Sequence, residues 1–147
     1  MSKEILQQFV SANKEFCAYA KAMTPEQLSH VPAPGEWSPA YVIHHMADSD
    51  AHFLVRFLNI LSTVKPAIVP FDEEAFPTTL GYVGRNVAIS IASIEAATAQ
   101  LVDIFSNVSD EVWNRTGVHP ERGELTASAL LQLTLNHRVG HLEQLKK

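Results

Sequence analysis

The chain has 147 residues and a mass of 16.2 kDa, a length that favours one domain and leaves too little chain for two of ordinary size. Hydrophobic residues make up 46% of it and charged residues 18%, a globular composition that excludes an intrinsically disordered protein. The formal net charge of −5 argues against a nucleic-acid-binding protein, because such proteins normally present a basic face.

The cysteine content and the N-terminal sequence indicate the cellular compartment of the protein. A single cysteine, Cys17, excludes an intramolecular disulfide framework and favours a reducing compartment. The opening residues, Met-Ser-Lys-Glu-Ile-Leu, lack the basic-then-apolar order of a signal peptide, and no continuous apolar run approaches the roughly 18–20 residues of a membrane span. We therefore expect a cytoplasmic protein with neither a membrane nor a nucleic-acid partner.

Four long segments show the apolar periodicity of amphipathic helices. These segments cover residues 3–22, 38–64, 83–106 and 126–146. Short helical turns are expected after Thr24, at 72–76 and at 109–113, and residues 116–125 are expected to form a loop or a small hairpin. Four long helices without a convincing strand pattern predict an all-α four-helix bundle in which residues 1–147 form one domain.

The connection at residues 65–82 predicts the order of the helices. It is long enough to cross the bundle from end to end, which allows the second and third helices to run parallel. The positions of the histidines indicate the same helix order. His45 lies about two turns after the start of its helix, whereas His137 and His141 lie near the end of theirs. These side chains meet only if the second and fourth helices are antiparallel, as in an up-down-down-up bundle.

Histidines on two of the expected helices are the feature that indicates a metal-binding or catalytic site. His137 and His141 are four residues apart on one helix face, and Leu130 on the same stripe directs that face to the core. His45 interrupts an apolar stripe in the same way, whereas His44 lies about 100° around the helix and faces away. A shared cation would satisfy all three buried rings and leave coordination positions open. The alternative is three unrelated histidines, two bonded to core carbonyls and one at the surface.

Further polar residues follow His45 along the second helix. Asp48 and His52, three and seven residues later, are candidate catalytic residues that orient a ligand or transfer a proton; the alternatives are a solvated carboxylate and a packing histidine. Arg56, one turn on, is a candidate for holding an anionic substrate or for a surface ion pair. Cys17 has no base near it in the sequence, so we expect a small buried apolar residue there.

Several motifs together carry a family resemblance. The chain has Trp-Ser at 37–38, Val-Ile-His-His-Met-Ala-Asp-Ser at 42–49, and His-Arg-Val-Gly-His at 137–141. It also has Pro-Phe-Asp-Glu-Glu-Ala-Phe at 70–76 and His-Pro at 119–120. With these motifs the chain resembles, over nearly its whole length, the DinB/YfiT-like superfamily of metal-dependent enzymes, and within it the bacillithiol-transferase-like branch.

The resemblance implies a four-helix bundle, often a homodimer, in which His45, His137 and His141 bind a divalent metal ion. Imidazole suits several metals, of which zinc or nickel is expected here. Characterised members of the superfamily include thiol-dependent S-transferases and a thiol-dependent maleylpyruvate isomerase, and many are described only as metal-dependent hydrolases. The chain departs from the branch at Asp50, where a histidine is usual, and His52 follows two residues later.

Two enzymatic hypotheses follow, both with a small-molecule substrate. In one, the metal activates water to hydrolyse an ester, an amide or a related bond. In the other, it binds a low-molecular-weight thiol as the nucleophilic thiolate for S-transfer to an electrophile. The alternative is a non-catalytic helical interaction domain, metal-free or stabilised by metal, and a fourth protein ligand would favour it because it would close the coordination shell.

Overall fold

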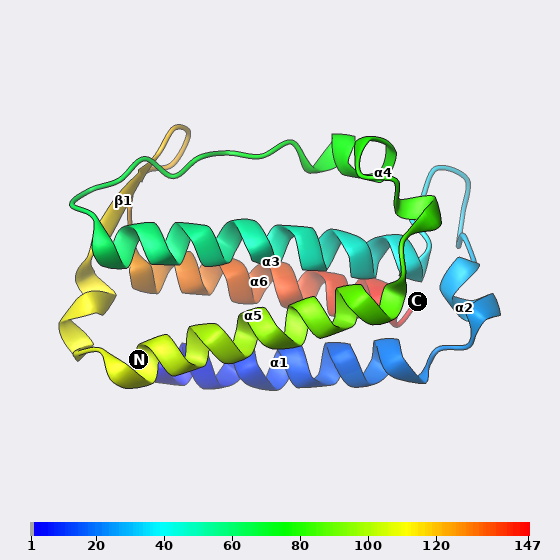
Figure 1. Cartoon of the computed structure of the whole chain (residues 1–147), viewed down its shortest axis with the longest axis horizontal. Helices are drawn as coiled ribbons and strands as arrows, with labels where there is room; N and C mark the ends of the chain where they lie inside the picture. The colour runs from blue at the N-terminus through cyan, green and yellow to red at the C-terminus, as the bar shows by residue number, and fades with distance from the viewer. Residues whose placement is uncertain (1) are drawn as a thin grey trace.

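Four long helices form the bundle in this computed structural model, which describes residues 2–147. They are α1 (Ser2–Ala22), α3 (Pro39–Ser62), α5 (Val87–Asn107) and α6 (Ala127–Leu145). Figure 1 shows α1 and α6 running in one direction and α3 and α5 in the other, so the order is up-down-down-up. Helix α3 packs against α5 and α6, and α1 packs against the same two helices. The predicted four-helix bundle, with antiparallel second and fourth helices, is confirmed.

Seven short elements complete the fold. They are α2 (Pro25–Ser29), η1 (Glu73–Ala75), α4 (Phe76–Thr79), η2 (Tyr82–Gly84), η3 (Asp110–Asn114), β1 (Thr116–His119) and β2 (Gly123–Thr126). The expected capping box at Thr24 is present, since Gln27 N donates to Thr24 Oγ1 at 3.2 Å and Thr24 N donates to Gln27 Oε1 at 2.8 Å. The segment at 116–125 is an antiparallel hairpin rather than an open loop.

The third long helix begins four residues later than the sequence pattern indicates. The expected start is residue 83, but Tyr82–Gly84 form a separate 3-10 turn and Arg85 has an extended backbone with ψ 149°. Asn86 is the N-cap, and its side chain accepts a hydrogen bond of 2.9 Å from Ala88 N. The apolar periodicity continues upstream of this cap, which is why it alone misplaces the boundary.

Helix α5 is the most apolar element of the described chain. Within residues 2–147 it alone is long and apolar enough to meet the length-and-composition criterion for a membrane span, with a mean hydropathy of 1.5. Core helices of globular bundles meet the same criterion. Helix α5 packs along α1 and α3, and its inward side chains, Ile91, Ile94, Leu101 and Phe105, are buried.

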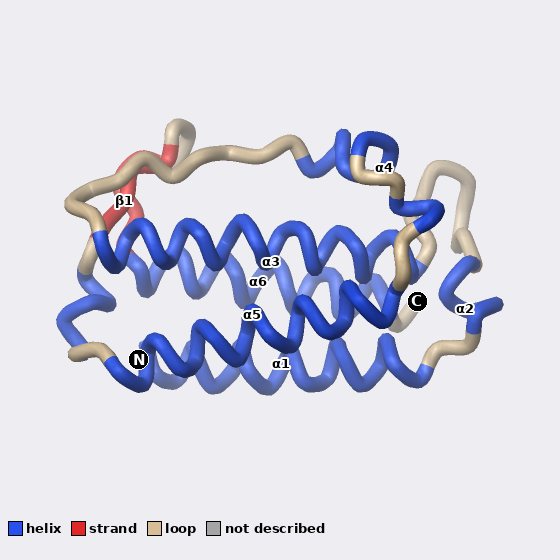
Figure 2. The backbone as a smooth tube through the Cα atoms, in the orientation of Figure 1, coloured by secondary structure: helices blue, strands red, loops and turns tan. Residues whose placement is uncertain are grey.

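A long crossover, residues 63–86, carries the chain from the end of α3 back to the start of α5 along the outside of the bundle (Figure 2). Its first part is held by the hairpin. Val118 N donates to Pro66 O at 2.9 Å, and Ile68 N donates to Val118 O at 2.8 Å. Gly117 allows this close approach, because a Cβ there would lie 3.0 Å from side-chain atoms of Ile60 and Ile68.

Replacing Gly117 by alanine should therefore lower the free energy of unfolding by about 1–3 kcal/mol, because the added methyl group has no room. Gly140 is the matched control, since a methyl group added at its position on α6 would meet no neighbouring atom within 4 Å. Gly140→Ala should raise stability by about 0.5–1 kcal/mol through helix propensity. Urea denaturation measures both, and an unchanged stability of Gly117→Ala would contradict the close packing.

Candidate metal centre

The imidazoles of His45, His137 and His141 converge between α3 and α6. His137 Nε2 lies 3.1 Å from His45 Nε2 and 3.1 Å from His141 Nε2. His45 is 1% exposed, and the other two rings are partly buried. The antiparallel packing of the two helices produces this arrangement, because it sets the early turns of α3 beside the last turns of α6.

The two 3.1 Å spacings to His137 Nε2 fit nitrogens that share a cation, and all three ligand atoms lie within 4.8 Å of one another. Ligands about 2.0–2.1 Å from one metal are separated by about 3.0 Å at octahedral angles and about 3.4 Å at tetrahedral angles. The Nδ1 atoms of His45 and His137 are buried without a hydrogen-bond partner among the described residues. His141 Nδ1 lies 2.8 Å from Gln144 Oε1, a contact that places the proton on Nδ1 and leaves the Nε2 lone pair for a metal.

Burial keeps these rings in the neutral form that binds metals. Desolvation, together with the neighbouring His141, lowers the pKa of His45 to about 4. The same causes, with His45 added, lower the pKa of His137 to about 3. Desolvation is also the main reason that the pKa of His141 is lowered. At neutral pH the site therefore presents three uncharged donors.

Acidification should destabilise the metal-free protein. The unfolded histidines titrate near pH 6.5 and the folded His45 and His137 near 4 and 3, so the unfolded state binds more protons between these values. Their stabilising contribution is complete above about pH 6.5 and is lost as the pH falls through the folded pKa values. His137→Phe should reduce the slope of unfolding free energy against pH by on the order of 1 kcal/mol per pH unit. Identical slopes for wild type and His137→Phe would contradict this assignment.

Two openings reach the histidines from outside. One is lined by Trp37, His45, His141 and Gln144, with acidic side chains from the neighbouring loops. The other is a cleft of about 400 Å³ whose lining includes His137. Two openings on one set of donors leave room for both a nucleophile and a substrate.

Glu73 borders both openings. It lies on the 3-10 turn η1 of the crossover, and its Oε2 is 3.8 Å from His45 Nε2. Partial burial, with smaller contributions from Glu74 and Asp72, raises the pKa of this carboxyl. Sequence analysis missed Glu73 as a site residue, because the crossover has no periodicity to place a side chain. The one available signal was the acidic run at residues 72–74.

The sequence candidate Asp48 lies on the outer side of α3. It accepts a hydrogen bond of 2.9 Å from Tyr82 Oη and two from Arg85, at 2.6 and 3.0 Å. Within residues 2–147 no hydrogen bond joins Asp48 to the three converging histidines. The carboxylate therefore fastens the far end of the crossover to α3, and its expected catalytic role stays a prediction.

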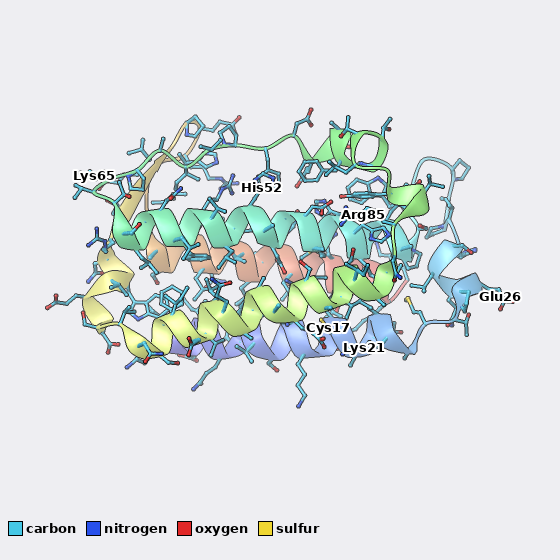
Figure 3. The ribbon with its side chains drawn as sticks, viewed as in Figure 1. Cys17, Lys21, Glu26, His52, Lys65 and Arg85 are labelled. Carbon is cyan, nitrogen blue, oxygen red and sulfur yellow. The ribbon has the colours of Figure 1, made fainter. Side chains whose placement is uncertain are left out.

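The next two turns of α3 continue this attachment. His52 lies between α3 and the crossover (Figure 3) and stacks on Phe71, with ring centroids 4.2 Å apart, and on Phe76 at 5.8 Å. Arg56 Nη2 donates to Val69 O at 2.8 Å. Together with Asp48, these side chains form a row at every fourth residue that holds the crossover, and hence Glu73, above the site. Proton transfer by His52 likewise stays a prediction.

Asp50 is buried and forms an ion pair with Arg138. Arg138 is 0% exposed, and its guanidinium lies 5.7 Å from the Phe9 ring centroid and 5.2 Å from that of Phe16. The pair joins α3 to α6 one residue away from His137. It links the two helices that supply the converging imidazoles.

Two further expectations concern residues outside the site. His44 faces away from the three histidines, as expected, and its Nδ1 lies 2.8 Å from Ser90 Oγ. Cys17 is buried, and desolvation raises the pKa of its thiol to about 11. The thiol therefore stays protonated at neutral pH, which agrees with the expected packing role.

Comparison with known proteins identifies relatives over most of the chain. The family model described as the DinB superfamily matches residues 8–145. "Putative metal-dependent hydrolase YfiT" of Bacillus subtilis strain 168 is 26% identical over 155 residues, which cover 100% of this chain and 87% of the relative. A protein of Oceanobacillus iheyensis, also named "Putative metal-dependent hydrolase", is 29% identical over 117 residues, which cover 80% of this chain and 67% of the relative.

Solved structures show the same fold. The structure of Bacillus subtilis YfiT, described as "a probable metal-dependent hydrolase with an unusual four-helix bundle topology", matches with a TM-score of 0.85 at 23% identity and covers 99% of this chain and 85% of that one. A mycothiol-dependent maleylpyruvate isomerase matches with a TM-score of 0.80 at 13% identity. This chain spans 60% of the isomerase chain. At these identities the likeness concerns the fold.

Proposed function

The chain belongs to the DinB superfamily, and from this premise we propose that it is a metal-dependent enzyme acting on a small molecule, with one divalent cation on His45, His137 and His141. The observation that carries the proposal is the convergence of three neutral imidazoles. The Nε2 atoms of His45 and His141 each lie 3.1 Å from the Nε2 atom of His137. The relatives' names, which read "Putative metal-dependent hydrolase", support the metal-dependent class.

The chemistry follows from the donor set. A zinc or nickel ion on three neutral ligands keeps its full positive charge and supplies Lewis acidity that lowers the pKa of a bound water or thiol. The three histidines occupy one side of the site, and the two openings leave the other side accessible to reactants. An accessible side favours catalysis over the structural alternative, which needs a closed shell of protein ligands.

Glu73 supplies the base in this proposal. Its Oε2 faces His45 from the crossover, on the side where the nucleophile enters, and accepts the proton that the nucleophile loses. The raised pKa of the carboxyl brings it closer to neutrality, which improves a general base. The row at residues 48, 52 and 56 acts indirectly, by fixing the segment that carries this carboxylate.

Two nucleophiles fit the site, a thiol and water. The two openings favour a thiol, because S-transfer brings together two organic reactants and each opening admits one of them. The fold likeness to a mycothiol-dependent isomerase agrees with this preference. Hydrolysis, the activity in the names of the sequence relatives, is the second candidate and uses water in the same position.

Metal analysis tests the proposal. Wild-type protein purified under metal-replete conditions should contain about one equivalent of divalent metal, as should the control His30→Ala, which alters an exposed histidine. His137→Ala should lose most of it, because it removes the nitrogen that contacts both other donors. Absence of stoichiometric metal from the wild type would overturn the proposed enzyme.

Substitution of Glu73 separates catalysis from metal binding. Glu73→Gln should retain the metal but lose about 10²–10⁴-fold in turnover, because the amide cannot accept the proton. Glu26→Gln, on the exposed surface of α2 (Figure 3) and outside the lining of both openings, is the control and should retain wild-type turnover. The assay pairs a panel of low-molecular-weight thiols with monobromobimane and runs a panel of esters beside it. Turnover that needs no added thiol would eliminate the transferase version.

The expected homodimer and cytoplasmic location stay predictions. Multi-angle light scattering of the metal-loaded protein measures the oligomeric state, and a mass of about 32 kDa, twice the chain mass of 16.2 kDa, is expected. A mass of one chain at all concentrations would contradict the dimer.

A further inference from the structure

The five arginines of the chain divide into two groups. Arg85 and Arg138 each form an ion pair with an aspartate, and Arg115 donates to two backbone carbonyls at the C-terminal end of α3. Arg56 and Arg122 form no ion pair with any carboxylate within residues 2–147. Both of these unpaired arginines line one cleft, the opening whose lining includes His137.

Arg56 lacks a counterion in a place where a charge is costly. Its guanidinium lies 5.2 Å from the Phe53 ring centroid and 4.9 Å from that of Phe71. One nitrogen donates to Val69 O, and the buried Nε has no partner among the described residues. Desolvation lowers the pKa of this arginine, which reflects a charge that no neighbouring anion compensates. A bound anion would supply the missing compensation.

The hairpin also contributes to the lining of the cleft. Arg122 lies on the exposed turn between β1 and β2. His119 Nδ1 accepts hydrogen bonds of 3.2 Å from the backbone N–H groups of Glu121 and Arg122, so Nε2 carries the ring proton and is a donor. The acidic Glu121 and Glu73 also line the cleft, and Glu73 Oε2 lies 3.8 Å from His45 Nε2.

The remaining lining is apolar. It consists of Phe53, Phe71, Leu125, Leu130 and Leu133, with Pro70 beside them. The other opening has no arginine; its lining carries three glutamates, Glu36, Glu73 and Glu74, against one cation, Lys147, so its acidic side chains outnumber its basic ones. The two openings therefore differ in the charge of the ligand that each accepts, and the arginine-lined cleft combines donors for an anion with surface for an apolar group.

We propose that this cleft is a substrate subsite for a small molecule with an apolar body and a carboxylate or phosphate group. The anionic group lies between Arg56 and Arg122, and the reacting end points toward His137. This inference rests on the proposed function, because it assigns the substrate class of the same site. It makes Arg122 a specificity-determining residue.

Binding of three probes to the metal-loaded protein tests the subsite. Benzoate and phenyl phosphate carry the anion on an aromatic ring, and benzamide is the neutral analogue of benzoate. Titration calorimetry should show that benzoate or phenyl phosphate binds at least about tenfold more tightly than benzamide. The ratio of the dissociation constants of benzoate and phenyl phosphate shows whether the subsite prefers a carboxylate or a phosphate. Equal affinity for benzoate, phenyl phosphate and benzamide would overturn the proposal.

Arg122→Gln is the decisive variant, because its exposed side chain contributes no hydrogen bond to the fold within residues 2–147. This variant should bind the preferred anion about tenfold more weakly than the wild type and should bind benzamide with unchanged affinity. The matched control is Lys14→Gln, which removes one positive charge from an exposed position on α1 and should bind like the wild type. Arg56→Lys, which keeps the charge but loses the planar donor group, should weaken the same anion.

Repeating the titration after chelation distinguishes the subsite from the metal. Binding that disappears with the metal but is indifferent to Arg122→Gln places the anion on the metal and overturns the subsite, while the proposed function stands. Binding that depends on Arg122 in a protein that takes up no metal supports the subsite and overturns the proposed function. Dependence on Arg122 in metal-loaded protein supports both.

Discussion

The antiparallel packing of α3 against α6 is the constraint on which the site depends. It brings His45 beside His137 and His141, so that three neutral Nε2 atoms face one another. Neutral rings whose Nε2 lone pairs are directed at a common point are an unfavourable arrangement without a cation. The buried Asp50–Arg138 pair joins the same two helices, and breaking either side of such a pair leaves an uncompensated buried charge.

The two sides of α3 contribute to the site in different ways. The inner side supplies His45, and the outer side holds the crossover through the row at residues 48, 52 and 56. The crossover in turn carries Glu73 to within 3.8 Å of His45. The long connection that makes α3 and α5 parallel therefore also delivers a carboxylate to the open side of the histidines. The crossover thus determines both the order of the helices and the position of Glu73.

Sequence periodicity was enough to predict the long helices, their order and the convergence of His45, His137 and His141, because helix faces follow from spacing and the helix directions follow from one long connection. It was not enough for Glu73, which lies on a segment whose path is set by contacts with the hairpin and α3. Asp48 and His52 were placed on the correct helix, but their partners, Arg85 and Phe71, come from the crossover. Long-range pairings of irregular chain leave no periodic signal.

X-ray absorption spectroscopy of the metal-loaded protein tests the central claim most directly, because the fine structure reports the number of imidazoles bound to the metal. The account predicts three imidazoles in the wild type and two in any His45→Ala protein that still holds metal. A metal bound by one imidazole or none, or a spectrum that His45→Ala leaves unchanged, would contradict the convergence of α3 and α6 on a single ion.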